Sequence, residues 1–233
     1  MKLAIMQPYF FPYIGYFQLI NAVDVFVVYD NIQFTKRGWI NRNRILADGK
    51  DIIFTIPIKK DSDYLDVKQR ELSKSFGIES GKIVRKIKAT YQKTPFYNDV
   101  MPIIEECFRC DSFNLFDFIY SSIKLLIQFF QIDTEIIISS SIDIDHNLKS
   151  QEKVLAICEN LDADIYINAI GGQHLYSTET FCNRSIELNF IQTKSIEYKQ
   201  FDNKFIPFLS IIDVMMFNSK RKIKQMLTEF ELV

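Results

Sequence analysis

The stretch KLAIMQPYFFPYIGYFQLINAVDVFVVYD, residues 2–30, decides the fold class of this chain. Its two ends, residues 2–6 and 25–30, are short apolar runs of the kind found in strands that are buried in a parallel sheet. Residues 15–22 lie between them and are long enough for a helix that crosses from one strand to the next. The segment is therefore predicted to form a βαβ unit.

The same alternation returns in the second half of the chain. Further strands are predicted at residues 51–56, 135–141, 164–168 and 187–191, and helices at 151–161, 174–181, 211–217 and 221–230. Apolar residues recur at helical spacing in the middle, so residues 80–131 are expected to be a mainly helical insertion. The sequence thus predicts an α/β fold of the three-layer Rossmann-like type, a mainly parallel sheet within one domain over residues 1–233.

The charge balance and the start of the chain exclude several classes of protein. The 28 basic and 29 acidic side chains give a net charge of -1, which leaves no broad positive field for nucleic acid. Gln7 and Pro8 interrupt the first apolar run before it reaches the length of a signal peptide or a membrane span. We therefore expect a cytoplasmic protein with no membrane span, no nucleic-acid partner and reduced cysteines.

The cysteines and the usual nucleotide motifs point to no resident cofactor. Cys107 and Cys110 have CxxC spacing, but no second cysteine pair or histidine stands nearby, so a zinc or redox role is not expected. The chain lacks the GxGxxG, P-loop and GxSxG patterns. We therefore expect neither a metal nor a cofactor.

Because ligands of such sheets bind beyond the carboxyl ends of the strands, the loops that follow the strands are the places to seek a site. The first of these loops contains Gln7, Tyr13, Gly15 and Tyr16. Its aromatic rings and prolines either pack a rigid turn against the sheet, or Gly15 begins a helix whose free amides face a phosphate or carboxylate. The sequence alone does not separate these two interpretations.

The second loop, residues 30–44, gathers amide side chains, four cations and the single tryptophan directly after a buried strand. Gln33 and Asn41 are candidates for hydrogen bonds with a substrate. Arg42 suits bidentate recognition of a phosphate or carboxylate, although it could instead form a salt bridge with Asp30. Asp30 is in turn a candidate to move protons.

Two further loops follow the later strands. The run Ser139 to Ser141 suits either a phosphate-binding nest or a helix cap. Gly171 and Gly172 permit close approach of a ligand to the backbone. His174 is a candidate general base, because histidine is easily poised near neutral pH.

The motifs in these loops together resemble one known family. They are QPYFFPYIGY at residues 7–16, DNIQF at 30–34, Asn41 with Arg42, the Tyr166 and Gly171 region with Tyr176, and LSIID at 209–213 followed by Asn218. In this combination the chain resembles the WbqC-like protein family over nearly its whole length. Members of that family occur in bacterial gene clusters for O-antigen and related surface glycans, so the resemblance implies a cytoplasmic step on an activated sugar.

A more distant similarity concerns residues 12–16 and 32–34. This arrangement is similar to that of pantothenate synthetase, a nucleotidylyltransferase in which an HxGH turn precedes a strand and a QF-containing loop. Tyr13 and Tyr16 stand where that enzyme has its two histidines. The similarity implies a shared fold, whereas adenylyl transfer does not follow from it.

These observations lead to three hypotheses about function. The first is a transferase of O-antigen biosynthesis that adds a small acyl or aminoacyl group to a nucleotide-linked amino sugar, with a CoA or carrier-protein thioester as donor. The substrate would contact Gln7, Tyr13, Gly15, Tyr16, Gln33, Asn41, Arg42, Gly171, Gly172 and Tyr176, and His174 or Asp30 would move protons. The alternatives are a nucleotidyltransferase that uses ATP or CTP and a non-catalytic protein that binds nucleotide sugars. A homodimer is compatible with each of them.

Overall fold

A computed structural model of the chain describes residues 1–109, 111–202 and 204–233. Its main sheet has six strands in the order β5-β2-β1-β6-β7-β8. These are β1 Lys2–Met6, β2 Val25–Val28, β5 Glu135–Ile138, β6 Ile165–Ala169, β7 Glu187–Thr193 and β8 Phe230–Leu232. All neighbouring pairs are parallel except β7 with β8. The predicted α/β class with a mainly parallel sheet is therefore confirmed.

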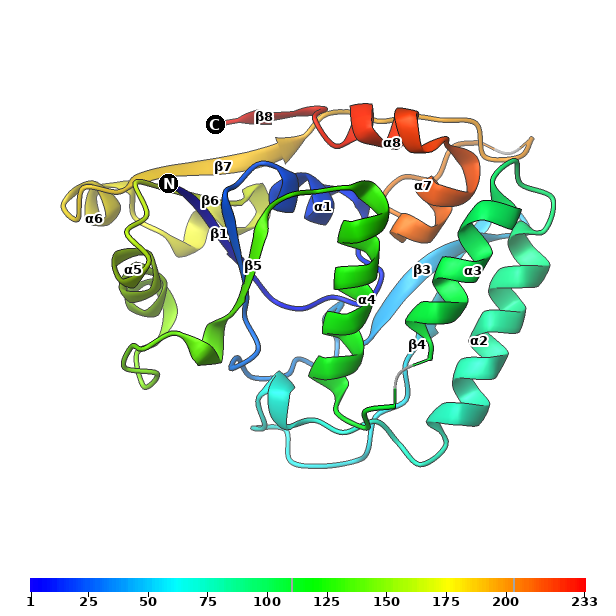
Figure 1. Ribbon diagram of the computed structural model, residues 1–233, viewed down its shortest axis with the longest axis horizontal. Coiled ribbons are helices and arrows are strands. Elements are labelled where there is room, and N and C mark those ends of the chain that lie inside the picture. The colour runs from blue at the N-terminus through cyan, green and yellow to red at the C-terminus, as the bar shows by residue number, and fades with distance from the viewer. Residues whose placement is uncertain (110, 203) are drawn as a thin grey trace.

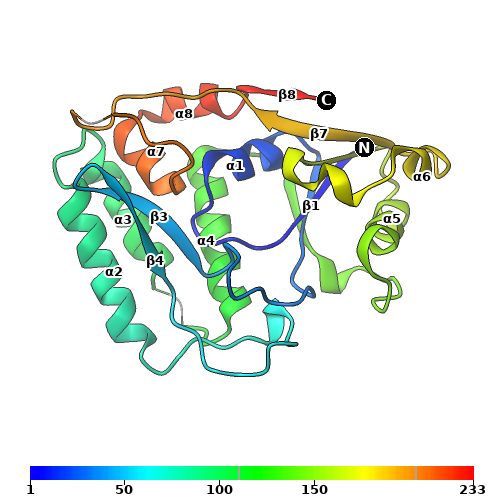
Figure 2. The same ribbon diagram turned by 180° about the vertical axis from the view of Figure 1, so that it is seen from behind.

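Helices cover both faces of this sheet, which gives three layers (Figures 1 and 2). On one face lie α1 Ile14–Asn21, α4 Leu115–Phe130, α7 Ile211–Phe217 and α8 Lys220–Met226, with α2 Phe76–Tyr91 and α3 Tyr97–Cys107 outside them. On the other face lie α5 Ser150–Asn160 and α6 Thr178–Cys182. The chain thus runs from β1 outward to β5, crosses to the opposite face through α5 and returns to the middle of the sheet at β6.

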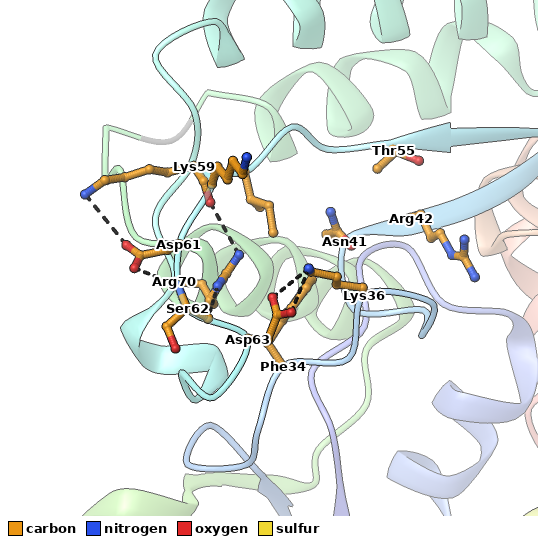
Figure 3. A pocket seen from close by; sticks show the side chains of 12 residues that line it. Phe34, Lys36, Asn41, Arg42, Thr55, Lys59, Asp61, Ser62, Asp63 and Arg70 are labelled. Carbon is orange, nitrogen blue, oxygen red and sulfur yellow. Dashed lines mark hydrogen bonds and ion pairs between the residues drawn. The ribbon is translucent and has the colours of Figure 1, made fainter.

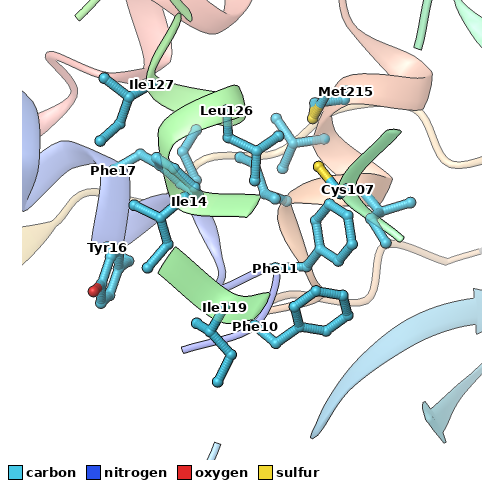
Figure 4. Close-up of a cluster of buried hydrophobic side chains, with 14 of the residues drawn as sticks. Phe10, Phe11, Ile14, Tyr16, Phe17, Cys107, Ile119, Leu126, Ile127 and Met215 are labelled. Atoms are coloured by element: carbon cyan, nitrogen blue, oxygen red, sulfur yellow. The ribbon is translucent and has the colours of Figure 1, made fainter. Parts of the chain in front are cut away.

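The larger core is built around the aromatic residues of the first loop. Phe10 and Phe11 are fully buried, and their ring centroids lie 4.5 Å apart. They pack with residues of α1, α3, α4 and α7, as the close-up shows (Figure 4). Because a fully buried phenylalanine contributes about 1.5–3 kcal/mol, this loop is a main source of stability. The packing interpretation of its aromatic residues therefore holds for Phe10 and Phe11.

The predicted strand at residues 51–56 lies outside the main sheet. It is β4, Lys50–Thr55, and it pairs antiparallel with β3, Arg42–Ala47, in a separate two-stranded sheet. Asp48 and Gly49 connect the strands with φ angles of 50° and 72°. Positive φ at both positions suits the turns that join two-residue hairpins, for which Asp-Gly is a preferred pair.

The insertion and the end of the chain differ in detail from the prediction. Three helices, α2 to α4, fill the middle of the chain, and the first begins at Phe76. Cys107 is buried at the end of α3, whereas Cys110 lies outside the described residues. The predicted helix at 221–230 ends at Met226, and β8 follows it. The predicted helix at 174–181 is shorter, because a 3₁₀ turn, η3 Ile170–Leu175, precedes α6.

Two properties of the described residues concern membranes and metals. Within them, no helix combines the length and the apolar character needed to cross a bilayer. In the same residues, no cluster of three or more histidine, cysteine, aspartate or glutamate side chains has the arrangement of a metal site.

Candidate functional site

The strands are added on one side of β1 as far as β5 and then on its other side from β6 onward, so the switch point of the sheet lies between β1 and β6. Ligands of such sheets bind beyond the carboxyl ends of the strands near this point. Gln7 follows β1, Asp30 follows β2, Ser139 follows β5 and Ile170 follows β6. The loops named from the sequence therefore gather at one edge of the sheet. The side chains of these loops fall into four groups.

Asp30 joins the ends of β2 and β5. Its side chain is 2% exposed and accepts hydrogen bonds from the Ser140 amide at 2.9 Å and the Ser140 hydroxyl at 2.6 Å. Arg42 donates instead to the Gly38 and Arg37 carbonyl oxygens, so the salt bridge considered between Arg42 and Asp30 is wrong. The Ser139 hydroxyl donates to the Asn31 side chain at 2.8 Å. This serine run is thus occupied by contacts within the protein.

The first loop closes on itself through Tyr16. This side chain is buried, and its hydroxyl donates to the Gln7 carbonyl oxygen at 3.1 Å. Burial raises the pKa of Tyr16 well above its ordinary value. A Cβ atom at Gly15 would lie 2.4 Å from the Tyr13 ring, so the glycine allows that ring to lie against α1. Tyr13 also lines a largely apolar cavity of about 590 Å³ formed with residues 193–198, 204–205 and 207–209.

A second cavity, of about 560 Å³, lies between the β3–β4 hairpin and the loop that precedes η1, Val67–Gln69 (Figure 3). Its lining includes two residues named from the sequence, Asn41 and Arg42. The Asn41 amide nitrogen donates to the Ile56 carbonyl oxygen at 2.8 Å. The Arg42 guanidinium lies 5.4 Å from the centroid of the Trp39 ring. We call this cavity the cationic pocket, because it also holds Lys36, Lys59, Lys60 and Arg70.

Arg70 is the most unusual residue of the cationic pocket. It is 3% exposed, and its guanidinium lies 4.9 Å from the centroid of the Phe34 ring. Its terminal nitrogens donate to the carbonyl oxygens of Ser62 at 2.7 Å and Lys59 at 3.3 Å, whereas its buried Nε has no partner. Among the described residues, no carboxylate lies within ion-pair distance of it. A buried cation without a counter-charge is costly and favours an anionic ligand.

The other charges of the cationic pocket are partly neutralised. Lys36 pairs with Asp63 at 2.6 Å, and Lys59 pairs with Glu71 at 2.6 Å. Figure 3 shows the Lys36 and Asp63 side chains pointing toward one another. Gln33 is exposed beside this pair and donates to the Asp63 carbonyl oxygen at 2.9 Å. Asp61 also lines the pocket, 4.0 Å from the Lys59 amine. The remaining excess of positive charge within the lining belongs to Arg42, Lys60 and Arg70.

The loop after β6 separates its named residues into two sets. The Asn168 amide nitrogen donates to the hydroxyls of Tyr166 at 2.7 Å and Tyr176 at 3.0 Å. A Cβ at Gly172 would lie 3.1 Å from the Asn168 side-chain oxygen, so this glycine has a close neighbour. Gly171 and His174 lie instead at the exposed surface of the 3₁₀ turn.

The sequence reasoning missed Lys153, in the first turns of α5. It is 4% exposed, and its amine is 3.5 Å from the Asn31 carbonyl oxygen and 3.4 Å from that of His146. The same amine lies 5.1 Å from the centroid of the Tyr29 ring. Burial, followed by the nearby Tyr176 and Asp66, raises the pKa of Tyr29 to about 12.

The sequence contained a signal for Lys153 but none for Arg70. Within the predicted helix at 151–161, Lys153 precedes Ile157 by four positions and therefore shares its buried face. A lysine on the apolar face of a helix is unusual. Arg70 stands among exposed polar residues, and its burial results only from the way the 58–70 loop folds back onto Phe34.

Comparison with known proteins agrees with the motifs. The uncharacterized protein Rv1507c of Mycobacterium tuberculosis (strain ATCC 25618 / H37Rv) is 25% identical over 218 residues, which are 92% of each chain. No solved structure matches the chain. The WbqC-like protein family matches residues 7–225, which confirms the resemblance drawn from the motifs. The chain therefore belongs to the WbqC-like protein family.

Proposed function

We propose that this protein is a cytoplasmic enzyme of bacterial surface-polysaccharide (O-antigen) biosynthesis. It transfers a small acyl or aminoacyl group to an amino sugar carried on a nucleotide. The donor is a thioester of CoA or of a carrier protein, and the reaction needs no resident metal or cofactor because the thioester already carries a leaving group. The same polypeptide forms one domain and is compatible with a homodimer.

The observation that carries this proposal is Arg70 in the cationic pocket. A guanidinium that is 3% exposed and has no carboxylate partner among the described residues can be neutralised by a ligand phosphate. Arg42 and Lys60 line the same pocket and add two further positive charges. The volume, about 560 Å³, lies within the range of small-molecule sites. These features together suit the diphosphate of a nucleotide sugar.

The other named residues have roles in the proposed reaction that depend on their position. Asn41 and Gln33 stand in and beside the cationic pocket, where they orient the nucleotide sugar. Gln7, Tyr13, Gly15 and Tyr16 shape the first loop, and Gly171, Gly172 and Tyr176 shape the loop after β6. His174 and Asp30 are proposed to move protons.

A binding experiment tests the proposed ligand. Thermal unfolding is measured with a panel of nucleotide sugars, free nucleotides and CoA esters. A ligand at about 100 times its dissociation constant stabilises the folded state by about 2.7 kcal/mol, which raises the melting temperature by about 5–10 °C. The absence of any shift with nucleotide sugars would contradict the proposal.

Variants connect that shift to the cationic pocket. Arg70→Met is expected to weaken binding about 10-fold or more, because a hydrogen bond to a charged group contributes about 1.5–3 kcal/mol. Arg42→Met, at a half-buried position, gives the same loss if Arg70→Met does not fold. Arg184→Met is the matched control, since Arg184 is exposed and pairs with Glu159 at 2.6 Å. Wild-type affinity in every variant that folds would exclude the cationic pocket as the binding site.

Turnover is tested by incubating the protein with an amino-sugar nucleotide and acyl thioesters, followed by mass spectrometry. Arg42→Ala and His174→Ala are expected to abolish turnover while the circular dichroism spectrum stays that of the folded protein. Wild-type turnover in both variants would reject these residues as parts of the site.

The strand order and the Tyr13-Ile14-Gly15-Tyr16 turn at the start of α1 favour nucleotidyl transfer as a second candidate. Release of pyrophosphate from ATP or CTP in the presence of Mg²⁺ distinguishes this reaction from group transfer. Binding of a nucleotide sugar without consumption of any cosubstrate would instead indicate a non-catalytic binding protein.

A further inference from the structure

Lys153 is a buried amine with weak compensation for its charge. Only 4% of the residue is exposed, and the amine contacts two carbonyl oxygens at 3.4–3.5 Å, longer than usual hydrogen bonds. Among the described residues, no carboxylate lies within 4.0 Å of it. Desolvation of an ammonium group in such a place favours its neutral form.

The groups around Lys153 come from each element packed against it. Tyr29 and Asp30 follow β2, Asp66 and Lys68 belong to the η1 region, and His146 follows β5. Burial is the largest influence on the Lys153 pKa and lowers it, as Lys68 does, whereas Asp66 and Asp30 raise it. The two carboxylates balance the two amines, so this cluster does not attract anions as the cationic pocket does.

Lys153 is also better placed to take up a proton than the two candidates named from the sequence. Both carboxylate oxygens of Asp30 already accept hydrogen bonds from Ser140. His174 lies at the exposed surface of η3, beyond the end of β6. The amine of Lys153 lies under Asn31 and His146, which are themselves partly or fully exposed, at the carboxyl edge where ligands of this fold bind.

We infer that Lys153 is the catalytic base that accepts a proton from the amino group of the acceptor sugar. The inference rests on the proposed group transfer. In that step the sugar nitrogen forms a bond to the acyl carbon, and the carbon–sulfur bond of the thioester breaks. The proton lost by the nitrogen moves to the Lys153 amine in its unprotonated form, and from there it reaches the leaving thiolate through His174 or Asp30. The step consumes one amine and one thioester and yields one amide and one thiol.

The protonation state of Lys153 is tested first, without any substrate. The protein is labelled with acetic anhydride over a series of pH values, and the modified lysines are quantified by mass spectrometry. Lys149, which is exposed and precedes α5, is the internal reference. The midpoint of labelling for Lys153 is expected to lie at lower pH than that for Lys149. Equal midpoints, or a higher one for Lys153, would overturn the inference and leave the proposed function standing.

Turnover then separates a base from a fixed positive charge. Lys153→Met and Lys153→Arg are both expected to lower kcat about 100-fold or more, because neither side chain can accept a proton near neutral pH. KM for the nucleotide sugar is expected to change little, since its diphosphate binds in the cationic pocket. The control Lys149→Met is expected to retain wild-type kcat, and wild-type kcat should fall as the pH is lowered through the pKa of Lys153.

The outcomes are distinct. Retention of kcat in Lys153→Arg would show that the residue supplies charge and would overturn its role as base. A raised KM with an unchanged kcat in the Lys153 variants would make Lys153 a binding residue and would also overturn its role as base. A wild-type protein that transfers no group to any amino-sugar nucleotide would reject the proposed function, and the role of Lys153 with it, even if the labelling midpoint is low.

Discussion

Single buried polar side chains hold distant parts of this chain together, and Asp213 is the clearest case. It is fully buried and accepts hydrogen bonds from the hydroxyls of Tyr91 at 2.8 Å and Tyr198 at 2.7 Å. The Gln200 amide nitrogen donates to it at 2.7 Å. Asp213 lies within the LSIID motif that helped to identify the family, so the motif residue has a structural task here.

Replacing Asp213 by Ala leaves the buried Tyr91 hydroxyl and the half-buried Tyr198 hydroxyl without an acceptor, whereas the Gln200 amide nitrogen keeps the Ile206 carbonyl oxygen at 3.1 Å. Because an unsatisfied buried donor costs about 1–3 kcal/mol, we expect the free energy of unfolding in urea to fall by about 3 kcal/mol or more. Asp202→Ala, at a position that is 99% exposed, is the control and is expected to change it little. A loss for Asp213→Ala no larger than that of the control would contradict this role.

The same variant gives a pH dependence whose sign follows from burial. Burial raises the pKa of Asp213 above its ordinary value of 3.8, so the folded chain holds this proton at pH values where the unfolded chain has lost it. This contribution to stability is complete below pH 3.8 and is lost as the pH rises through the folded-state pKa. The difference in unfolding free energy between wild type and Asp213→Ala should therefore shrink as the pH rises from 3.8 through the folded-state pKa.

Lys153 makes the opposite contribution to stability. Its pKa is lowered by burial, so below the folded-state pKa the protein bears the cost of a buried charge, and stability rises as the pH approaches the ordinary value of 10.5. At neutral pH the folded chain either buries the charge of this amine or releases its proton, and both cost free energy, so Lys153→Met is expected to stabilise the protein by about 1 kcal/mol. A melting temperature about 2–4 °C above wild type would support this, whereas destabilisation at neutral pH would contradict it.

These residues also show why part of the site was not predictable. Asn41 and Arg42 were named because they stand in a dense local cluster of amides and cations. Lys153 was marked only by its place on the apolar face of a predicted helix, and the burial of Arg70 depends on residues far away in the sequence. Local patterns therefore indicate where charge is concentrated, but not where a single charge is desolvated.

At the scale of elements, the first loop is held between α7 and the β3–β4 hairpin. Phe11 has a φ angle of 46°, which is unusual for a bulky side chain. Its carbonyl oxygen accepts from the Asn43 amide nitrogen at 2.6 Å and from the Ser210 hydroxyl at 2.8 Å. The Ser210 oxygen also accepts from the Ile212 amide at the start of α7, so one hydroxyl fixes the loop and caps the helix.

Ser210→Ala removes both contacts and is expected to lower the free energy of unfolding by about 1–2 kcal/mol. The measurement is the urea midpoint at constant slope. Ser219→Ala is the matched control, because Ser219 caps α8 in the same way but makes no contact with the first loop. If both variants lose the same free energy, the bond to Phe11 contributes nothing.

Elements were predictable where their pattern is long or repeated. The strands β1, β2, β6 and β7 are apolar runs that alternate with helices, and the sequence shows this directly. The strand β8 has three residues and pairs with Ile191–Thr193, about 40 positions earlier, so no local pattern marks it. The 3₁₀ turn after β6 runs to Leu175, and the Ser177 side chain caps α6, so the helix begins at Thr178 rather than at residue 174.

For the whole molecule, the sheet has two edges that are protected differently. The outer strand β5 has four residues, and β8 covers the long strand β7 on the opposite side. Figure 1 shows β8 beside β7 at the C-terminus. Without β8, the strand β7 would offer unpaired backbone groups to another chain. The last four residues are therefore expected to prevent association through β7.

Deletion of residues 230–233 tests that function of β8. The shortened chain is expected to associate in a concentration-dependent manner, which size-exclusion chromatography with light scattering measures. Leu232→Lys is the control, because this exposed side chain can change while the backbone bonds between β7 and β8 remain. A shortened chain whose mass is the same as that of wild type at every concentration would contradict the expectation.

The ring centroid of the single tryptophan, Trp39, lies 5.4 Å from the guanidinium of Arg42 and 5.7 Å from that of Arg44. Arg42 also lines the cationic pocket, so an anion that draws Arg42 inward changes the electric field at the indole ring. The protein therefore carries its own optical reporter for this pocket. Ligand titrations can be followed by the intrinsic emission of Trp39, without a label, and Arg42→Met should silence that signal.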